Sequence, residues 1–324
     1  MSELVKDRSE IVFLYDIKDT NPNGDPGNDN MPRIDEETFI NIVTDVRLKR
    51  TIRDYLMDFK GEEIFIKEIT NEDGTIQDAK ARANNFLEKI DIKEEGFNKQ
   101  KEEIKKAILE RCVDVRLFGA TIPLEIPVKK GDKTENVTGS ITLTGPVQFR
   151  MGRSLHKVEL KHIKGTGAFA SKKGATQKTF REEDILPYSL ISFYGIINEN
   201  AAKHTLLTED DILLLLEGIW NGTKNLISRS KVGQMPRLLL KVNYKGDDYH
   251  LGDLDKLIKI KDIKNIVEEK IRDINDIELD ATELVKTINS HKEKIDSIDL
   301  KIDDRVRINL EGLDTTIKIS NIVF

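Results

Sequence analysis

Hydrophobic positions in the first part of the chain follow two periods, one typical of strands and one typical of helices. Residues 10–17 are rich in β-branched and aromatic side chains, which predicts a strand buried on both faces. A turn-rich segment with three Gly/Pro clusters follows at 19–32. Apolar side chains then recur at helical spacing between residues 43 and 59, which predicts a helix with Thr44 or Asp35 as its N-cap. Its outer face would carry Arg47, Lys49, Arg50 and Arg53.

The middle of the chain combines a charged insertion with two further strand patterns. Residues 60–111 are charged and mostly helix-like, most clearly at 79–90 and 101–111, and we interpret them as an insertion outside the main core. Residues 113–118 alternate between apolar and polar up to a glycine, and residues 137–149 alternate in part. Each of these two segments therefore predicts a strand.

A lysine-rich segment separates this region from the next strand. Residues 157–183 contain three glycines, many lysines and few large apolar side chains, so they cannot bury much surface and should project from the domain. Residues 188–197 predict a strand, and a capped apolar helix follows at 208–227. Residues 237–244 predict one more strand.

The resulting order is strand, helix, strand, strand, helix, strand. This is the split βαβ order of RRM-like (ferredoxin-like) folds, so the fold class is predicted to be α+β. Residues 245–324 alternate Ile and Leu with Asp and Lys without a signature. For this last part we expect helices near 262–275 and 281–294 and strands near 305–310 and 315–323.

Composition removes several classes of protein. In 324 residues, 38% are apolar and 34% are charged, which is enough apolar material for a buried core and excludes wholesale disorder. The single cysteine, Cys112, excludes a disulfide framework and a Cys-rich metal site. No apolar run reaches the roughly 18 residues of a membrane span, and the first residues lack the apolar core of a signal peptide. We therefore expect a cytoplasmic protein without a membrane partner.

The net charge of −6 conceals an uneven distribution of charge. Residues 145–181 contain nine Lys and Arg against one acid, and residues 221–245 contain six against none. A solvated surface usually mixes signs, whereas a polyanion site gathers one sign where phosphates lie. The distribution predicts a nucleic-acid partner, and two unrelated cationic surface stretches remain the alternative.

Two stretches within these basic blocks are candidate binding segments. In residues 145–157, Phe149, Met151 and Arg153 would share one face of a strand, and cations beside an aromatic ring are typical of single-strand RNA binding. In residues 227–237, small residues would let backbone N–H groups approach phosphate. The alternatives are a core strand that ends in a charged turn and an ordinary cationic connection. If both stretches flank one groove, each supports the other.

Known catalytic and cofactor motifs are absent or incomplete. The pattern Asp19-x-Asn21-x-Asn23-Gly24 matches half of a calcium loop but has Asn30 where a bidentate glutamate is needed. The same loop could be a structured turn, or it could face nucleic acid with its Asn amides. Gly165-x-Gly167-x-x-Ala170 lacks the strand and helix of a dinucleotide site, and there is no phosphate-binding P-loop. We expect no cofactor, no metal and no catalytic residue.

Several motifs occur in an order that resembles a known family. They are Asp19-Thr-Asn-Pro-Asn-Gly-Asp-Pro, Thr44-Asp-Val-Arg-Leu-Lys-Arg50, Asp114-Val-Arg-Leu-Phe-Gly119, Thr144-Gly-Pro-Val-Gln-Phe-Arg-Met-Gly-Arg-Ser154 and Pro187-Tyr-Ser-Leu-Ile-Ser-Phe-Tyr194. From about residue 10 to 245 the chain resembles the backbone subunit of the type I CRISPR surveillance complex (Cascade), in the RAMP superfamily. It is most similar to subtype I-B and close to subtype I-C.

The resemblance implies a set of parts and partners. Residues 1–59 and 112–245 would form an RRM-like palm, 60–111 a helical finger-like insertion, 157–183 a thumb hairpin, and 246–324 a C-terminal elaboration. Partners would be crRNA, further copies in a head-to-tail filament, other Cascade subunits and, through the guide, target DNA. The implied RNA-binding residues are Arg47, Lys49, Arg50, Arg150, Arg153, His156, Lys157, Arg229, Lys231 and Gln234.

Two functional hypotheses follow from these observations. The first is a non-catalytic RNA-binding scaffold that presents the spacer for pairing, because phosphate contacts suffice when base pairing reads the target. The alternative is a metal-dependent ribonuclease that uses loop aspartates, because Asp19, Asp25 and Asp29 lie close in sequence and two-metal chemistry needs clustered carboxylates.

Overall fold

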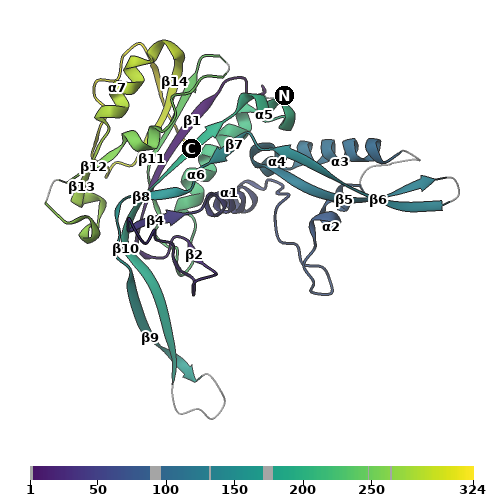
Figure 1. Cartoon of the computed structure of the whole chain (residues 1–324), viewed down its shortest axis with the longest axis horizontal. Coiled ribbons are helices and arrows are strands. Elements are labelled where there is room, and N and C mark those ends of the chain that lie inside the picture. The colour runs from purple at the N-terminus through teal and green to yellow at the C-terminus, as the bar shows by residue number, and fades with distance from the viewer. Residues whose placement is uncertain (1–2, 88–95, 131–132, 171–177, 247, 263–264) are drawn as a thin grey trace.

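The strand predicted at residues 10–17 lies inside a large sheet. The computed structural model describes residues 3–87, 96–130, 133–170, 178–246, 248–262 and 265–324. Nine strands form the sheet (Figure 1). Their order is β16-β14-β11-β1-β10-β8-β4, and β7 and β9 also pair with β10. Neighbouring strands are antiparallel except β14 and β16. Their bounds are β1 Ser9–Thr20, β4 Ile40–Val43, β7 Val147–Phe149, β8 Gly152–Lys157, β9 Lys161–Ala170, β10 Lys178–Ile197, β11 Met235–Tyr244, β14 Ile295–Ile302 and β16 Lys318–Asn321.

Helices α1 (Asp45–Lys60), α5 (Glu199–Thr205) and α6 (Glu209–Lys224) belong to the core on one face of the sheet (Figure 1). Phe13 and Tyr15 of β1 point into this core, whereas Val12 and Leu14 point to the opposite face, so β1 is buried on both sides as predicted. Thr44 caps α1 by accepting a hydrogen bond from the backbone N–H of its third residue, and Thr208 begins α6 with a capping box. Helix α6 ends at Lys224, three residues before the predicted end.

Residues after β11 cover the other face of the sheet. They form a second core with β1, β10 and β11, and β14 pairs with β11, which the sequence pattern did not predict. The helix predicted near 262–275 is wrong in its described part, and residues 263–264 lie outside the described residues. The elements here are η1 Leu254–Leu257, β12 Lys259–Asp262, η2 Glu268–Lys270, η3 Ile274–Asp276, β13 Ile277–Asp280, α7 Thr282–Ser290, η4 Lys292–Lys294 and β15 Ile308–Asn309.

A third core lies beside the sheet, where the helical insertion was expected. Its helices are α2 (Ala79–Leu87) and α3 (Phe97–Arg111), while residues 88–95 lie outside the described part of the chain. The hairpin of β5 (Gly119–Lys130) and β6 (Lys133–Thr144) packs on these helices and does not join the main sheet. The strand predicted at 137–149 is therefore two strands, β6 and β7, separated by Gly145 and Pro146.

The strand predicted at 113–118 is wrong, because this segment is the helix α4 (Val113–Phe118). Val113 and Leu117 face the core shared with α1 and α6, while Val115 faces the third core. Because two cores bury opposite sides of this short helix, its apolar residues alternate along the sequence as they would in a strand. Asp114 fixes the helix in place, since its carboxylate accepts bonds from Arg53 Nε (2.9 Å) and from two backbone N–H groups of the insertion. Arg53 is therefore buried and does not lie on the outer face of α1 as predicted.

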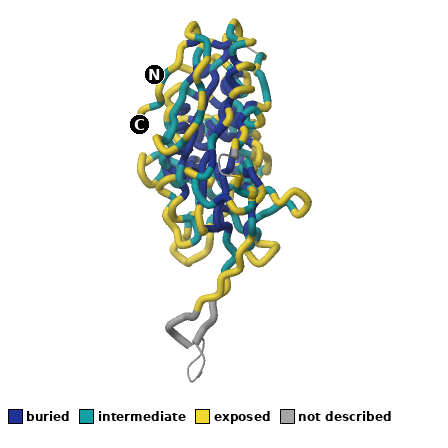
Figure 2. The backbone as a smooth tube through the Cα atoms, turned by 90° about the vertical axis from the view of Figure 1, so that its left-hand side faces the viewer, coloured by how far each residue is buried: buried dark blue, intermediate teal, exposed yellow. Residues whose placement is uncertain are grey.

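The described residues 161–170 and 178–183 of the segment predicted to project leave the main sheet. Strands β9 and β10 extend beyond the sheet as a two-stranded arm, which reaches downward in Figure 1, and Figure 2 shows mostly exposed residues near the base of this arm. Residues 171–177, within the lysine-rich part of the prediction, lie outside the described residues. None of the described helices is both long enough and apolar enough to cross a membrane.

Candidate nucleic-acid interface

Several segments meet at the end of the main sheet where β1 ends. Antiparallel pairing places the end of β1 beside the start of β11 and beside the base of the arm. The backbone N–H of Asn21, just after β1, donates to Ser230 O in the turn before β11 (3.1 Å). The Oδ1 atom of Asn23 accepts from both the backbone N–H and the hydroxyl of Thr44, the N-cap of α1 (2.9 Å each). These bonds hold the loop after β1, the start of α1 and the turn before β11 together.

Three donors at this junction have no acidic partner among the described residues. Arg47, in the first turn of α1, donates to Thr51 Oγ1 (3.0 Å), and its Nε atom has no partner. Among the described residues, the hydrogen-bond partner of Lys231 Nζ is the hydroxyl of Ser230 (3.3 Å). Gln234 is 4% exposed, its Nε2 has no partner, and it lines a small cavity with Arg47.

The charges of this cluster are held in an unfavourable environment. Burial lowers the pKa of the Arg47 guanidinium, although the nearby Asp54 acts in the opposite direction. Burial also lowers the pKa of Lys231, and the positive charge of Arg47 lowers it further. Two partly buried cations therefore repel each other beside an amide donor that has no partner. A bound anion would offset this repulsion and accept hydrogen bonds from the donors.

Other predicted residues on α1, β8 and the turn before β11 form ion pairs. The Arg50 and Arg229 pairs are exposed surface pairs, which contribute little to stability, so a phosphate can replace their carboxylates. The side chain of Lys49 is 13% exposed and also contacts Gln148, so its pair is not of this kind. The pairs are Lys49 with Asp45 (3.0 Å), Arg50 with Asp54 (2.7 Å) and Arg229 with Glu183 (3.0 Å). Arg153 has a long contact with Asp35 (3.7 Å), and Lys157 is exposed at the end of β8.

Arg150 does not join the others, which corrects the prediction that it lines the same groove. Its guanidinium donates to Asp253 and Asp255 (2.7 Å each) and lies over the ring of Tyr194, 4.1 Å from the centroid. Tyr194 belongs to the core formed with the C-terminal residues, on the face of the sheet opposite α1 and α6. The pattern in residues 145–157 gave no sign of these two acids, because they lie about a hundred residues further along the chain.

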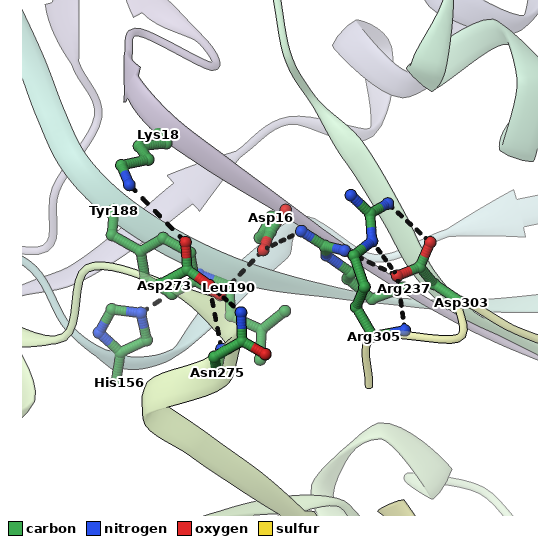
Figure 3. Close-up of polar contacts among 10 residues, drawn as sticks. All are labelled: Asp16, Lys18, His156, Tyr188, Leu190, Arg237, Asp273, Asn275, Asp303 and Arg305. Carbon is green, nitrogen blue, oxygen red and sulfur yellow. Dashed lines mark hydrogen bonds and ion pairs between the residues drawn. The ribbon is translucent and has the colours of Figure 1, made fainter. Parts of the chain in front are cut away.

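Arg237, which adds to the charge of the second basic stretch, is also committed to the interior. One Nη atom pairs with Asp16 Oδ2 (2.9 Å) and the other with Asp303 Oδ1 (2.8 Å), as Figure 3 shows. The hydroxyl of Tyr188 donates to the same oxygen of Asp16 (3.0 Å). Burial raises the pKa of Asp16 against the opposing effect of Arg237. This network joins the C-terminal residues to β1 and β11 and leaves Arg237 unavailable to a ligand.

Comparison with known proteins decides the family. The sequence profile of the family described as CRISPR-associated protein Cas7 matches residues 7–282. The chain belongs to the Cas7 family. A CRISPR-associated protein Cas7 from Haloferax volcanii is 34% identical over 315 residues, which cover 94% of this chain and 89% of that protein. The family predicted from the motif order is confirmed.

Solved structures show that the α+β fold is shared. A chain of a CRISPR RNA-guided surveillance complex, pre-nicking, matches with a TM-score of 0.54 and 11% identity over 97% of this chain and 96% of that one. A chain of a second CRISPR RNA-guided surveillance complex matches with a TM-score of 0.51 and 11% identity over 96% of this chain and 94% of that one. At this identity the likeness concerns the fold of this Cas7 protein.

His156 cannot contact RNA in this Cas7 structure, which corrects its predicted role. It is 1% exposed and stacks on Tyr188, with ring centroids 5.6 Å apart. Its Nε2 accepts the backbone N–H of Leu190 (3.2 Å; Figure 3), and its Nδ1 lies 2.7 Å from Lys157 O, a group that can only accept. These partners fix a neutral ring with the proton on Nδ1. Burial lowers the pKa of His156, which keeps it neutral.

This histidine should make the stability of the Cas7 protein fall with acidification. Below the unfolded-state pKa of about 6.5, the unfolded chain takes up a proton at His156 that the folded chain does not. When the pH falls from 7.5 to 5.5, we expect the free energy of unfolding to fall by about 1 kcal/mol less in His156→Gln than in the wild-type protein. Urea denaturation measures this difference. His204→Gln is the matched control, because His204 is exposed. Equal pH dependence of the wild-type protein and His156→Gln would contradict the neutral assignment.

The aspartate loop forms a structured turn. Asp25 Oδ1 accepts the backbone N–H of Gly27 (3.1 Å), and its other oxygen pairs with Arg33 (3.1 Å). Asp19 and Asp29 adopt left-handed backbone conformations, with φ of 50° and 44°, which Asp tolerates better than most residues. No group of three or more His, Cys, Asp or Glu in the described residues is placed to hold a metal ion.

The sequence did not identify Asn21, Asn23 and Thr44 as the residues that assemble this junction. The only signal was the density of Asn in a Gly/Pro-rich loop, which also fits an ordinary turn. Their role is visible only in the structure, because their partners lie outside the loop. Asn21 bonds to Ser230 in the turn before β11, and Asn23 bonds to Thr44 at the start of α1.

Proposed function

We propose that this Cas7 protein is a non-catalytic scaffold of a type I CRISPR surveillance complex. It binds crRNA, polymerises along it in the cytoplasm and presents the spacer for pairing with target DNA in antiviral defence. The observation that carries the proposal is the junction of Arg47, Lys231 and Gln234, whose donors have no acidic partner among the described residues. The names of the related protein and of the structurally similar complexes support the same role.

The sheet supports an RRM-like palm. Strands β11, β1, β10 and then β7 and β8 are neighbours, with α1 and α6 in the core of one face, which supports a split βαβ order in which β7, β8 and β10 replace the strands predicted at 113–118 and 137–149. The arm of β9 and β10 would be the thumb. The third core would be the finger, and it includes β5 and β6, so this part extends to Thr144 beyond the predicted limit of 111. Residues 246–324 would elaborate the palm.

Phosphate contacts explain why the junction holds cations with few exposed aromatic rings. When the guide reads its target by base pairing, the protein needs to hold the backbone and leave base edges free. Arg47 and Lys231, together with the exposed ion pairs of Arg50 and Arg229, supply charge of this kind. Arg153 and Lys157 are exposed on β8, and Arg153 lies with Arg150 on the face of the sheet opposite α1 and α6.

The projecting arm supports assembly with further copies. A two-stranded arm that leaves its own core can reach a neighbouring molecule, and head-to-tail contacts that do not close produce an open helical filament. We propose that this filament follows the crRNA, that other Cascade subunits bind at its ends or sides, and that the system is of subtype I-B. The ribonuclease alternative is not retained, since Asp25 is paired with Arg33 and the loop is held as a turn.

Purification of the protein from its host tests the proposal. We expect RNA of one uniform length to co-purify, because a filament of fixed size protects a fixed length of guide. Sequencing of that RNA should return CRISPR spacers, and a nuclease-treated lysate serves as the control for RNA acquired after lysis. Recovery of no RNA, or of RNA of mixed length without spacers, would contradict the scaffold role.

A further inference from the structure

A second cavity lies on the face of the sheet opposite α1 and α6. It measures about 700 Å³ and lies, partly open to solvent, between β8 and residues 255–260 and 266–271 of the C-terminal part. Its size is within the range of small-ligand sites, roughly 300–1,000 Å³. It lies outside the Arg47–Lys231–Gln234 junction, because none of these three residues lines it. We name it the β8 cavity.

One part of the wall of the β8 cavity is apolar. Ile258, Ile260, Ile266 and Ile271 line it from the C-terminal side, and Met151 lines it from the β7–β8 connection. Met151 is 55% exposed, so its side chain lies at an open edge of the cavity rather than in a core. An open apolar wall of this kind favours a flat, apolar ligand surface.

One buried polar group in the β8 cavity lacks a partner. Ser192 is 6% exposed, its hydroxyl has no hydrogen-bond partner, and it lines the cavity. Ser192 lies on β10 directly opposite Arg153 of β8. A buried hydroxyl without a partner has lost its hydration without gaining a hydrogen bond, so a ligand that bonds to it would be stabilised.

The charges that line the β8 cavity favour an anion. The carboxylate of Asp255 is held by Arg150, and that of Glu268 accepts the backbone N–H of Lys157 (2.9 Å), so both are already satisfied. Lys259 has no carboxylate within ion-pair distance among the described residues, and Arg153 has only its 3.7 Å contact with Asp35. Two cations are therefore available to a ligand.

We infer that the β8 cavity binds one nucleotide of a single nucleic-acid strand. The base lies against the isoleucine wall and Met151 and bonds to the Ser192 hydroxyl, while Lys259 and Arg153 hold its phosphate. This combination of an apolar face, hydrogen-bonding edges and an anion is the chemistry of a nucleotide. The inference rests on the proposed function for the source of the strand, and it adds a binding site on the second face of the sheet.

Methyl NMR of the full chain labelled at its five methionines tests this directly. Adenosine 5′-monophosphate should shift the Met151 methyl signal upfield in a saturable way, because a base stacked beside it exerts a ring current. Met57 is the internal control, because it packs against the first core. Met151→Leu assigns the signal. Deoxyadenosine 5′-monophosphate in a parallel titration distinguishes RNA from DNA as the source.

Two variants test the polar contacts. Ser192→Ala and Lys259→Gln should each weaken nucleotide binding by about threefold to tenfold, the effect of one hydrogen bond or ion pair. Ser192→Ala should not lower stability, because it removes an unpaired hydroxyl. Arg47→Glu with Lys231→Glu should weaken binding of a strand by about a hundredfold and leave the Met151 shift by the mononucleotide intact, so failure of the two proposals can be told apart.

Three outcomes would overturn the inference. One is that neither mononucleotide shifts Met151 at millimolar concentration. Another is that inorganic phosphate alone produces the same shift, which would make the site a general anion site. The third is that a synthetic acidic peptide with one aromatic residue shifts Met151 while the nucleotides do not, which would make the cavity a protein-docking site.

Discussion

Replacing Arg47 and Lys231 together by glutamate should lower affinity for single-stranded RNA by about a hundredfold at low salt. Both cations lie at the end of the sheet where the loop after β1, the start of α1 and the turn before β11 meet, and neither has a carboxylate partner among the described residues. Each lost phosphate contact should also reduce the slope of log affinity against log salt by about 0.7. Fluorescence anisotropy over a salt series measures both quantities.

The matched control makes the same charge change elsewhere. Lys6 and Lys203 are exposed, and Lys6 lies next to the start of β1, at the other end of that strand. Lys6→Glu with Lys203→Glu should change affinity by much less and leave the salt slope nearly unchanged. A thermal melt checks that both double variants are folded. Equal losses of affinity in the two double variants would mean that net charge, and not the junction, controls RNA binding.

Replacing Glu10 by glutamine should destabilise the protein by about 3–4 kcal/mol. The Glu10 carboxylate is fully buried and accepts four hydrogen bonds. Two come from the hydroxyls of Tyr194 and Tyr244, and two come from the backbone N–H groups of Leu251 and Gly252 (2.9 Å each). Glutamine would present an NH₂ group to donors, so at least two of these bonds are lost.

The hydroxyls of Tyr194 and Tyr244 stay protonated and donate to Glu10. Burial raises the pKa of both phenols, and Glu10 raises it further, so they remain protonated at every physiological pH. Because Leu251 and Gly252 begin the C-terminal part, Glu10→Gln should also speed amide hydrogen exchange in residues 251–300. Urea denaturation gives the free energy of unfolding, and hydrogen exchange gives the local effect.

Milder variants cover the case in which Glu10→Gln fails to fold. Tyr194→Phe and Tyr244→Phe each remove one donor and should each cost about 1 kcal/mol. Glu3→Gln is the control, because the side chain of Glu3 is 78% exposed. A loss below 1 kcal/mol in Glu10→Gln, without faster exchange after residue 250, would show that this carboxylate does not fasten the C-terminal part.

The charged contacts of the C-terminal part explain why one arginine in each basic stretch was misassigned. Arg150 was predicted to face RNA, but it pairs with Asp253 and Asp255. Arg237 was counted in the second basic stretch, but it pairs with Asp303. The net positive charge of a stretch therefore did not predict how many of its charges face solvent. At the junction itself, Arg47 and Lys231 have no such partner among the described residues, and the prediction of a cationic site stands as a proposal.

Local periodicity predicted the strands and helices that bury one whole face or both of their faces. The apolar run of β1, the spacing of α1, the capping box before α6 and the strand β11 were all predictable, because each depends on residues within a few turns or a few pleats. The projecting arm was predictable for the opposite reason, since its segment lacks apolar side chains to bury. The order of motifs also identified the family before any coordinates.

Only the tertiary structure decided the properties that depend on partners far along the chain. Helix α4 looked like a strand because two separate cores bury its two sides, and β14 joined the sheet without a signal of its own. His156 became a neutral interior ring because Leu190 and Tyr188 surround it. Whether a cation faces a ligand or an internal carboxylate is set by which distant residue the fold brings within about 4 Å, and a linear sequence does not contain that distance.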